Sequence, residues 1–124
     1  MKIESFTEIE AWKQARNFVS DVYNVFAKGD SKSDFGFRDQ IQRASVSIMS
    51  NIAEGFDSGS KKSFIQFLTY SYRSASEVAS LLFVALDIHY IDVNQHNELI
   101  SQLNSIKKLI GGFIRYLKNT QHPN

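Results

Sequence analysis

The chain has 124 residues, with 14 Lys and Arg against 13 Asp and Glu, so its formal net charge is +1. A balance this even gives no global attraction to nucleic acid, and any basic surface must be local. The absence of cysteine excludes disulfides, thiolate nucleophiles and thiolate metal ligands, and it fits a reducing cytoplasm.

The first half of the chain predicts two helices. Apolar residues at helical spacing predict a first helix over about residues 8–26, with a face made of Trp12, Ala15, Val19, Val22, Tyr23 and Phe26. A polar loop over residues 27–34 follows, and Asp34 is placed to cap the next helix. The second helix is expected over residues 35–54, with Gly55 in the left-handed conformation that often ends a helix.

The second half predicts two longer helices. Residues 57–60 form a loop, in which Ser60 is a plausible N-cap, and the third helix is expected over about residues 61–88. Its inward face is made of Phe64, Phe67, Leu68, Ala75, Val78, Ala79, Leu82 and Leu86. The fourth helix starts near Asp92 and carries a seam at three-four spacing, made of His96, Leu99, Leu103, Ile106, Ile110, Phe113 and Leu117. The only proline, Pro123, lies in the tail. We therefore expect one domain over residues 1–124, an all-α, antiparallel, up-down-up-down four-helix bundle.

Neither a signal peptide nor a membrane span is expected. Glu4, Glu8 and Glu10 follow soon after Met1-Lys2, and the longest apolar run, Leu81 to Leu86, is far shorter than the ~20 residues that a span requires. The predicted location is the cytoplasm, with no membrane as a partner.

The second helix has more apolar surface than one core needs. The stretch from Gln40 to Gly55 has an apolar face about twice the ~100° stripe of an ordinary surface helix. The third helix is apolar nearly all round from Leu81 to Leu86. Surplus apolar surface of this kind marks interfaces, so we expect the protein to form a homo-oligomer.

The same stretch carries a recognisable signature. It contains Arg43-Ala44, then Ser47-Ile48, then Ser50-Asn51-Ile52-Ala53-Glu54-Gly55, and Phe64, Phe67-Leu68 and Glu77 follow. This pattern resembles the four-helix-bundle protein family encoded in intervening sequences of bacterial 23S ribosomal RNA genes. Accessory proteins of diversity-generating retroelements resemble the same family. The resemblance implies a cyclic homopentamer, a nucleic-acid-binding role and, in the retroelement case, a reverse transcriptase as partner.

Two positions depart from the family pattern. Met49 stands where the family often has proline, which predicts a straighter second helix, and Gln42 stands where a second arginine is common.

The polar part of the signature comprises Arg43, Ser47, Asn51, Glu54 and Gly55. Two interpretations are open: a recognition site, or a capping and inter-helix network that holds the bundle together. Glu77 of the third helix either pairs with Arg43 across the bundle or lies on a solvated face.

No enzymatic arrangement is recognisable. The serines at positions 45, 47 and 50 lack an adjacent histidine or lysine base, which nucleophilic catalysis requires. His89, His96 and His122 do not have the spacing of metal ligands on a helix. We expect no enzyme, no metal, no cofactor and no small-molecule substrate.

The candidate nucleic-acid contacts are pairs of basic residues: Lys61 and Lys62, Lys107 and Lys108, Arg115 and Lys118. One copy of such pairs is ordinary surface, but a ring would repeat them by symmetry, and affinity grows with the number of phosphates neutralised. The first hypothesis, which the family resemblance implies, is an accessory protein that binds RNA or single-stranded DNA. The alternative is a protein-binding scaffold without a nucleic-acid role.

Overall fold

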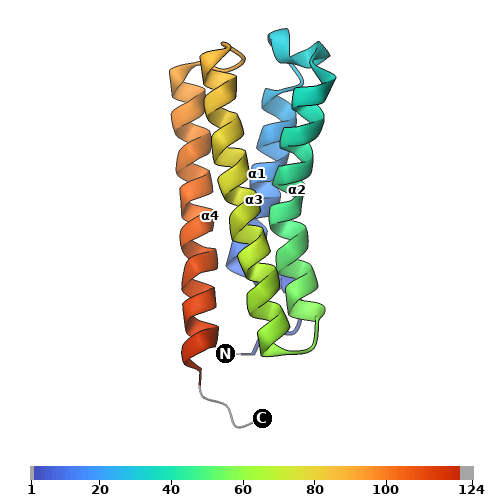
Figure 1. The fold of residues 1–124 in the computed structure, drawn as a ribbon, viewed down its shortest axis with the longest axis vertical. Coiled ribbons are helices and arrows are strands. Elements are labelled where there is room, and N and C mark those ends of the chain that lie inside the picture. The colour runs from blue at the N-terminus through green and yellow to red at the C-terminus, as the bar shows by residue number, and fades with distance from the viewer. Residues whose placement is uncertain (1, 121–124) are drawn as a thin grey trace.

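The computed structural model describes residues 2–120, so His122 and Pro123 lie outside the described residues. Four long helices follow one another: α1 (Glu10–Val25), α2 (Phe35–Asp57), α3 (Lys61–Asp87) and α4 (Val93–Asn119). Two short 3-10 helices, η1 (Phe6–Glu8) and η2 (Gly29–Ser33), precede α1 and α2. The long helices run alternately up and down, and each packs on its two neighbours (Figure 1). This confirms the all-α four-helix bundle.

Side-chain caps fix three of the helix starts where the sequence predicts them. Asp34 accepts a hydrogen bond from the backbone N–H of Phe37, and Ser60 accepts one from the N–H of Ser63. Asp92 and Gln95 form a reciprocal capping box at the start of α4. Each side chain pairs an N–H group that the first helical turn leaves without a partner.

A second contact of the Asp34 carboxylate joins the two turns at the same end of the bundle. The Tyr90 hydroxyl, just after α3, donates a 2.6 Å hydrogen bond to Asp34 Oδ2. This bond, helped by the Phe37 N–H, lowers the pKa of Asp34, and the same bond raises the pKa of Tyr90. The cap of α2 and the α3–α4 turn are therefore held by one carboxylate.

The buried core runs along the whole bundle and largely follows the predicted periodicity, but six residues predicted to face inward are only half-buried: Val19, Phe67, Ala79, Leu86, Phe113 and Leu117. On α1, two further residues differ from the prediction. Phe18 is fully buried, whereas Tyr23 is 44% exposed. α1 packs between α2 and α4, so its buried face is turned slightly from the one expected. The buried apolar residues of the other three helices are Ile41, Ala44, Ile48, Ile52, Phe64, Leu68, Ala75, Val78, Leu82, Ala85, Leu99, Leu103, Ile106 and Ile110.

The wide apolar face of α2 is used inside the bundle. Val46, Met49 and Ala53, which extend that face beyond the core, are all half-buried. α2 packs against both α1 and α3, and this second neighbour accounts for the extra width.

The prediction that Gly55 ends α2 in a left-handed conformation is wrong. α2 continues to Asp57, and the positive-φ glycines of the described chain are Gly29 and Gly59. A Cβ on Gly55 would lie 2.8 Å from Phe67 Cβ and 2.9 Å from Phe64 Cδ1. Gly55 is therefore present because α3 approaches the α2 backbone too closely for any side chain.

Candidate functional site

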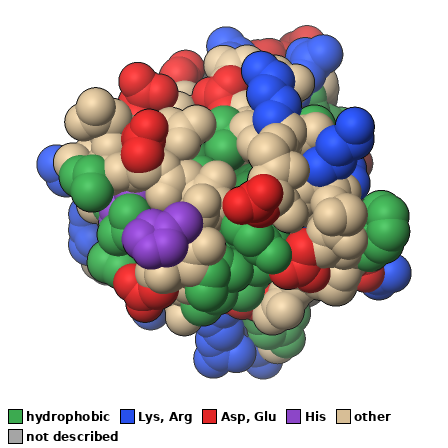
Figure 2. Space-filling view, turned by 90° about the horizontal axis from the view of Figure 1, so that it is seen from above, with side chains coloured by type: hydrophobic (Ala, Val, Ile, Leu, Met, Phe, Trp, Pro, Cys, Tyr) green, Lys and Arg blue, Asp and Glu red, His purple; other side chains and the backbone are tan. Residues whose placement is uncertain are grey.

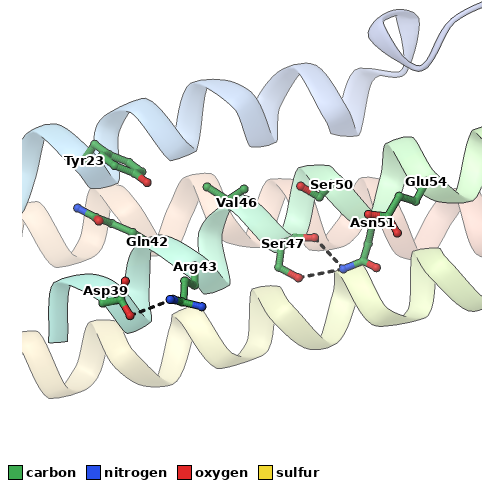
Figure 3. Close-up of a pocket in the computed structure, with 9 residues that line it drawn as sticks. All are labelled: Tyr23, Asp39, Gln42, Arg43, Val46, Ser47, Ser50, Asn51 and Glu54. Atoms are coloured by element: carbon green, nitrogen blue, oxygen red, sulfur yellow. Dashed lines mark hydrogen bonds and ion pairs between the residues drawn. The ribbon is translucent and has the colours of Figure 1, made fainter. Parts of the chain in front are cut away.

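The polar residues of the signature lie along one side of α2. Together with Tyr23 of α1, they line an open hollow of about 460 Å³ (Figure 3). We call this surface the motif face; it comprises Asp39, Gln42, Arg43, Val46, Ser47, Ser50, Asn51 and Glu54.

The inner edge of the motif face joins α2 to α3. The hydroxyls of Ser47 and Ser74 share a 2.9 Å hydrogen bond. The Asn51 side chain donates to both the backbone oxygen and the hydroxyl of Ser47, at 2.8 and 2.9 Å (Figure 3). Nearby, the buried Ser71 hydroxyl of α3 donates to the carbonyl of Ile48 at 2.7 Å. Ser47 therefore joins α2 to α3, and Asn51 holds the Ser47 side chain from one turn further along α2.

The outer edge of the motif face is open to solvent. Arg43 Nε donates a 2.9 Å hydrogen bond to Asp39 on its own helix, with the two side chains 80% and 63% exposed. Of the two alternatives for Glu77, the pairing with Arg43 is therefore wrong, because Arg43 pairs with Asp39 one turn away on α2, and Glu77 lies on an exposed face. Exposed pairs of this kind contribute about 0.5 kcal/mol or less. Arg43 and the exposed Glu54 are thus free of a large structural role, unlike Ser47 and Asn51.

Of the six candidate basic residues, Lys61 and Lys62 lie at the start of α3, and Arg115 and Lys118 lie near the end of α4. The antiparallel packing of the two helices brings these four to the same end of the bundle (Figure 1). Lys107 and Lys108 lie near the middle of α4. Lys61, at the start of α3, donates a 2.6 Å hydrogen bond to the carbonyl of Thr120, just after α4. This places Lys61 and Lys62 beside the last turn of α4, where Lys118 lies.

Further along the same two helices, the remaining three candidates surround one small hollow. Its volume is about 290 Å³, and it is lined by Tyr72, Asn104, Lys107, Lys108, Gly111 and Arg115. The Lys107 ammonium lies over the Tyr72 ring, 5.0 Å from its centre. Lys107 is consequently half-buried, whereas Lys108 and Arg115 are exposed.

Acidic residues are absent from this part of α3 and α4. Residues 61–76 and 99–119 contain seven of the chain's 14 basic residues and none of its 13 acidic ones. We call these seven the basic face: Lys61, Lys62, Arg73, Lys107, Lys108, Arg115 and Lys118. The charge of +7 here leaves −6 on the rest of a chain whose net charge is +1. Arg73 is not among the residues predicted from the sequence, because that prediction used pairs of basic residues. The stretch from Ser58 to Ser76, which contains no acidic residue, is the sequence signal that includes Arg73 in the basic face.

Two surfaces border or oppose the basic face. Lys108 also lines a mostly apolar groove of about 630 Å³, which contains Glu8, Glu10, Phe56 and Phe113. The opposite end of the bundle is mixed: apolar, acidic, basic and histidine side chains share it (Figure 2).

The histidines and serines stay apart in the described residues. His96 is buried with its ring 4.6 Å from that of Phe83, and His89 is exposed with φ of 64° in the α3–α4 turn. Within residues 2–120, no group of three metal-ligating side chains comes together, and no helix is long and apolar enough to cross a membrane. The buried Ser45 hydroxyl and His96 Nε2 have no hydrogen-bond partner there.

The architecture defines the class of protein: a four-helix bundle with a polar motif on α2 and a basic face on α3 and α4. The family profile described as "23S rRNA-intervening sequence protein" matches residues 7–112, and the chain belongs to this family.

A solved structure supports the fold. It is the 1.70 Å crystal structure of a protein with unknown function from the S23 ribosomal protein family of Bacteroides thetaiotaomicron VPI-5482. The two chains are 24% identical, the TM-score is 0.79, and the match covers 85% of this chain and 95% of the other. No curated protein matches the chain.

Proposed function

We propose that this protein is a non-catalytic, cytoplasmic, homo-oligomeric accessory protein that binds RNA or single-stranded DNA through phosphate contacts. The observation that carries the proposal is the basic face, with seven cations and no carboxylate in residues 61–76 of α3 and 99–119 of α4. Lysine and arginine position phosphates without reading base sequence, so binding is expected to be largely sequence-independent.

The charge separation explains how a nearly neutral chain can bind a polyanion. Carboxylates that lie farther from a bound phosphate than the Debye length, about 8 Å at physiological salt, repel it little because salt screens them. Glu8 and Glu10 are closer, since they share a groove with Lys108. A single subunit offers few contacts, and each phosphate neutralised contributes a separate salt-dependent increment. Binding by one copy is therefore weak, and repetition of the face in an oligomer strengthens it.

Exposed apolar side chains near the α3–α4 turn support the oligomer. Phe83, Val84, Ile88 and Val93 are exposed there, and Val93 is 61% accessible. Clusters of this kind mark protein interfaces. The family resemblance supports five copies in a ring, which requires a head-to-tail contact between unlike surfaces.

The assembly is tested by light scattering on the purified protein. We expect a pentamer, and Val93→Asp should lower the mass because it puts a charge into the apolar cluster. An acidic residue is favourable in the first turn of a helix, so the bundle itself should stay folded. A monomer at micromolar concentration would overturn the oligomer, whereas a dimer would overturn only the ring of five.

Nucleic-acid binding is tested by fluorescence anisotropy with labelled single-stranded RNA and DNA at low salt. The double variant Lys107→Glu/Lys108→Glu should weaken binding to all sequences alike. The control Lys13→Glu/Lys28→Glu makes the same charge change at two exposed lysines outside the basic face, and it should bind nearly as well as the unmodified protein.

Two results would overturn the nucleic-acid proposal: no binding by the unmodified protein, or an equal loss in both double variants. The apolar groove beside Lys108 would then become the leading site, for a protein partner. A scaffold role would replace the nucleic-acid role.

A further inference from the structure

The small hollow between α3 and α4 combines an aromatic ring with three cations. Tyr72 forms its α3 side, and Lys107, Lys108 and Arg115 stand on its α4 side with the amide of Asn104. No carboxylate lines it. Its volume of about 290 Å³ is just below the range of small-molecule sites, about 300–1,000 Å³. A site of this size and composition suits one nucleotide unit.

We propose that this hollow holds one nucleotide of a single strand, with the base stacked on Tyr72 and the flanking phosphates paired with Lys107, Lys108 and Arg115. The inference rests on the proposed nucleic-acid function and adds a selectivity to it. Phosphate contacts alone bind single strands and duplexes, whereas a stacking site favours single strands because their bases can be splayed out.

The Tyr72 ring is accessible to a base. It is 39% exposed, and the side chain over its face is Lys107, a long lysine that can move away. An exposed cation–π contact contributes about two- to fivefold to an equilibrium constant. Base stacking on an aromatic side chain contributes about five- to 150-fold per base. Replacing the ammonium by a base is therefore favourable, and the displaced ammonium becomes available to a phosphate.

Gly111 keeps the side of the ring next to α4 open. A Cβ at this position would lie 3.9 Å from Tyr72 Cε2 and 3.6 Å from Arg115 Nη1. Any larger side chain would occupy the space between the ring and the guanidinium. The glycine thus leaves room where the base and its phosphate would meet.

The experiment compares single strands with duplexes on the full-length protein. The probes are a short, non-self-complementary RNA, the DNA of the same sequence, and each of these as a duplex. Binding is measured by anisotropy for the unmodified protein, Tyr72→Leu and Tyr72→Phe. Leucine keeps the bulk and helix propensity without a π face, and phenylalanine restores the face. Circular dichroism verifies that each variant is folded.

Tyr70→Leu is the matched control. Tyr70 is also 39% exposed and lies two residues away, which places it on another side of α3. Its hydroxyl accepts a hydrogen bond from Gln66, outside the hollow. The change should therefore leave binding of all four probes unaltered.

We expect Tyr72→Leu to weaken binding of single strands fivefold or more and binding of duplexes less than twofold. Tyr72→Phe should bind all probes as the unmodified protein does. Comparison of the RNA and DNA probes shows which strand the hollow prefers. If the unmodified protein binds both forms and Tyr72→Leu weakens neither or both equally, the stacking site is overturned and the phosphate-binding function stands. If the unmodified protein binds no probe, both are overturned.

Discussion

Replacing Gly55 by alanine should destabilise the bundle, although alanine is the better helix former. Gly55 lies inside α2, where the exchange alone would gain about 1 kcal/mol. The new Cβ would stand 2.8 Å from Phe67 Cβ, 2.9 Å from Phe64 Cδ1 and 3.3 Å from the Phe64 carbonyl oxygen. A Cβ and a carbonyl cannot rotate away, so α2 and α3 must move apart. Overpacking of this kind costs about 1–3 kcal/mol, and we take the upper end.

The net loss for Gly55→Ala is then about 1–2 kcal/mol, which lowers the midpoint of thermal unfolding by about 4–8 °C in a domain of this size. The midpoint is measured by circular dichroism at a fixed protein concentration, because association of subunits makes the midpoint depend on concentration. Gly111→Ala is the control: its Cβ meets neighbours at 3.6 and 3.9 Å, ordinary contact distances, so this variant should be more stable by about 1 kcal/mol. If Gly55→Ala were as stable as Gly111→Ala, the close approach of α3 would not explain this glycine.

Three further predictions concern polar groups. Ser45→Ala should raise the free energy of unfolding by about 1 kcal/mol in urea titrations, because it removes a buried hydroxyl without a partner; a loss of stability would show that the hydroxyl is paired. Arg43→Ala should change the same quantity by less than about 0.5 kcal/mol, because the ion pair with Asp39 is exposed; a larger loss would mean that Arg43 holds the bundle together. Tyr90→Phe should destabilise the protein at pH 7, and this loss of stability should shrink as the pH falls through the lowered pKa of Asp34, because a protonated carboxyl is a weaker acceptor. A loss of stability that stays the same between pH 7 and pH 2 would refute the stabilising role of the Tyr90–Asp34 hydrogen bond.

The sequence predicts the helices and their starts well, because their signals are local. Asp34 and Ser60 each precede a periodic segment and cap it as expected, and the fourth helix starts at Asp92 as expected. The end of α2 depends on contacts that the sequence does not reveal. A glycine that ends a helix and a glycine that admits another helix look alike in sequence, and Phe64 and Phe67 distinguish them only once α3 is in place.

The basic face shows the same limit. Lys61 and Lys118 are far apart in sequence, and the contact of Lys61 with Thr120 depends on the antiparallel packing of α3 against α4. Tyr72 and Lys107 likewise meet only across this interface. The sequence therefore shows where the basic residues are along the chain, whereas the grouping of Lys107, Lys108 and Arg115 with Tyr72 around one hollow depends on the fold.

The most direct test of the account is the salt dependence of single-stranded RNA binding. For a single strand, the logarithm of the binding constant falls with the logarithm of salt concentration by about 0.7 for each phosphate neutralised. If the basic face binds phosphates, the slope for Lys107→Gln/Lys108→Gln should be shallower than that of the unmodified protein by about 1.4, the sum for two contacts. An unchanged slope, or a binding constant that does not vary with salt, would contradict nucleic-acid binding by the basic face.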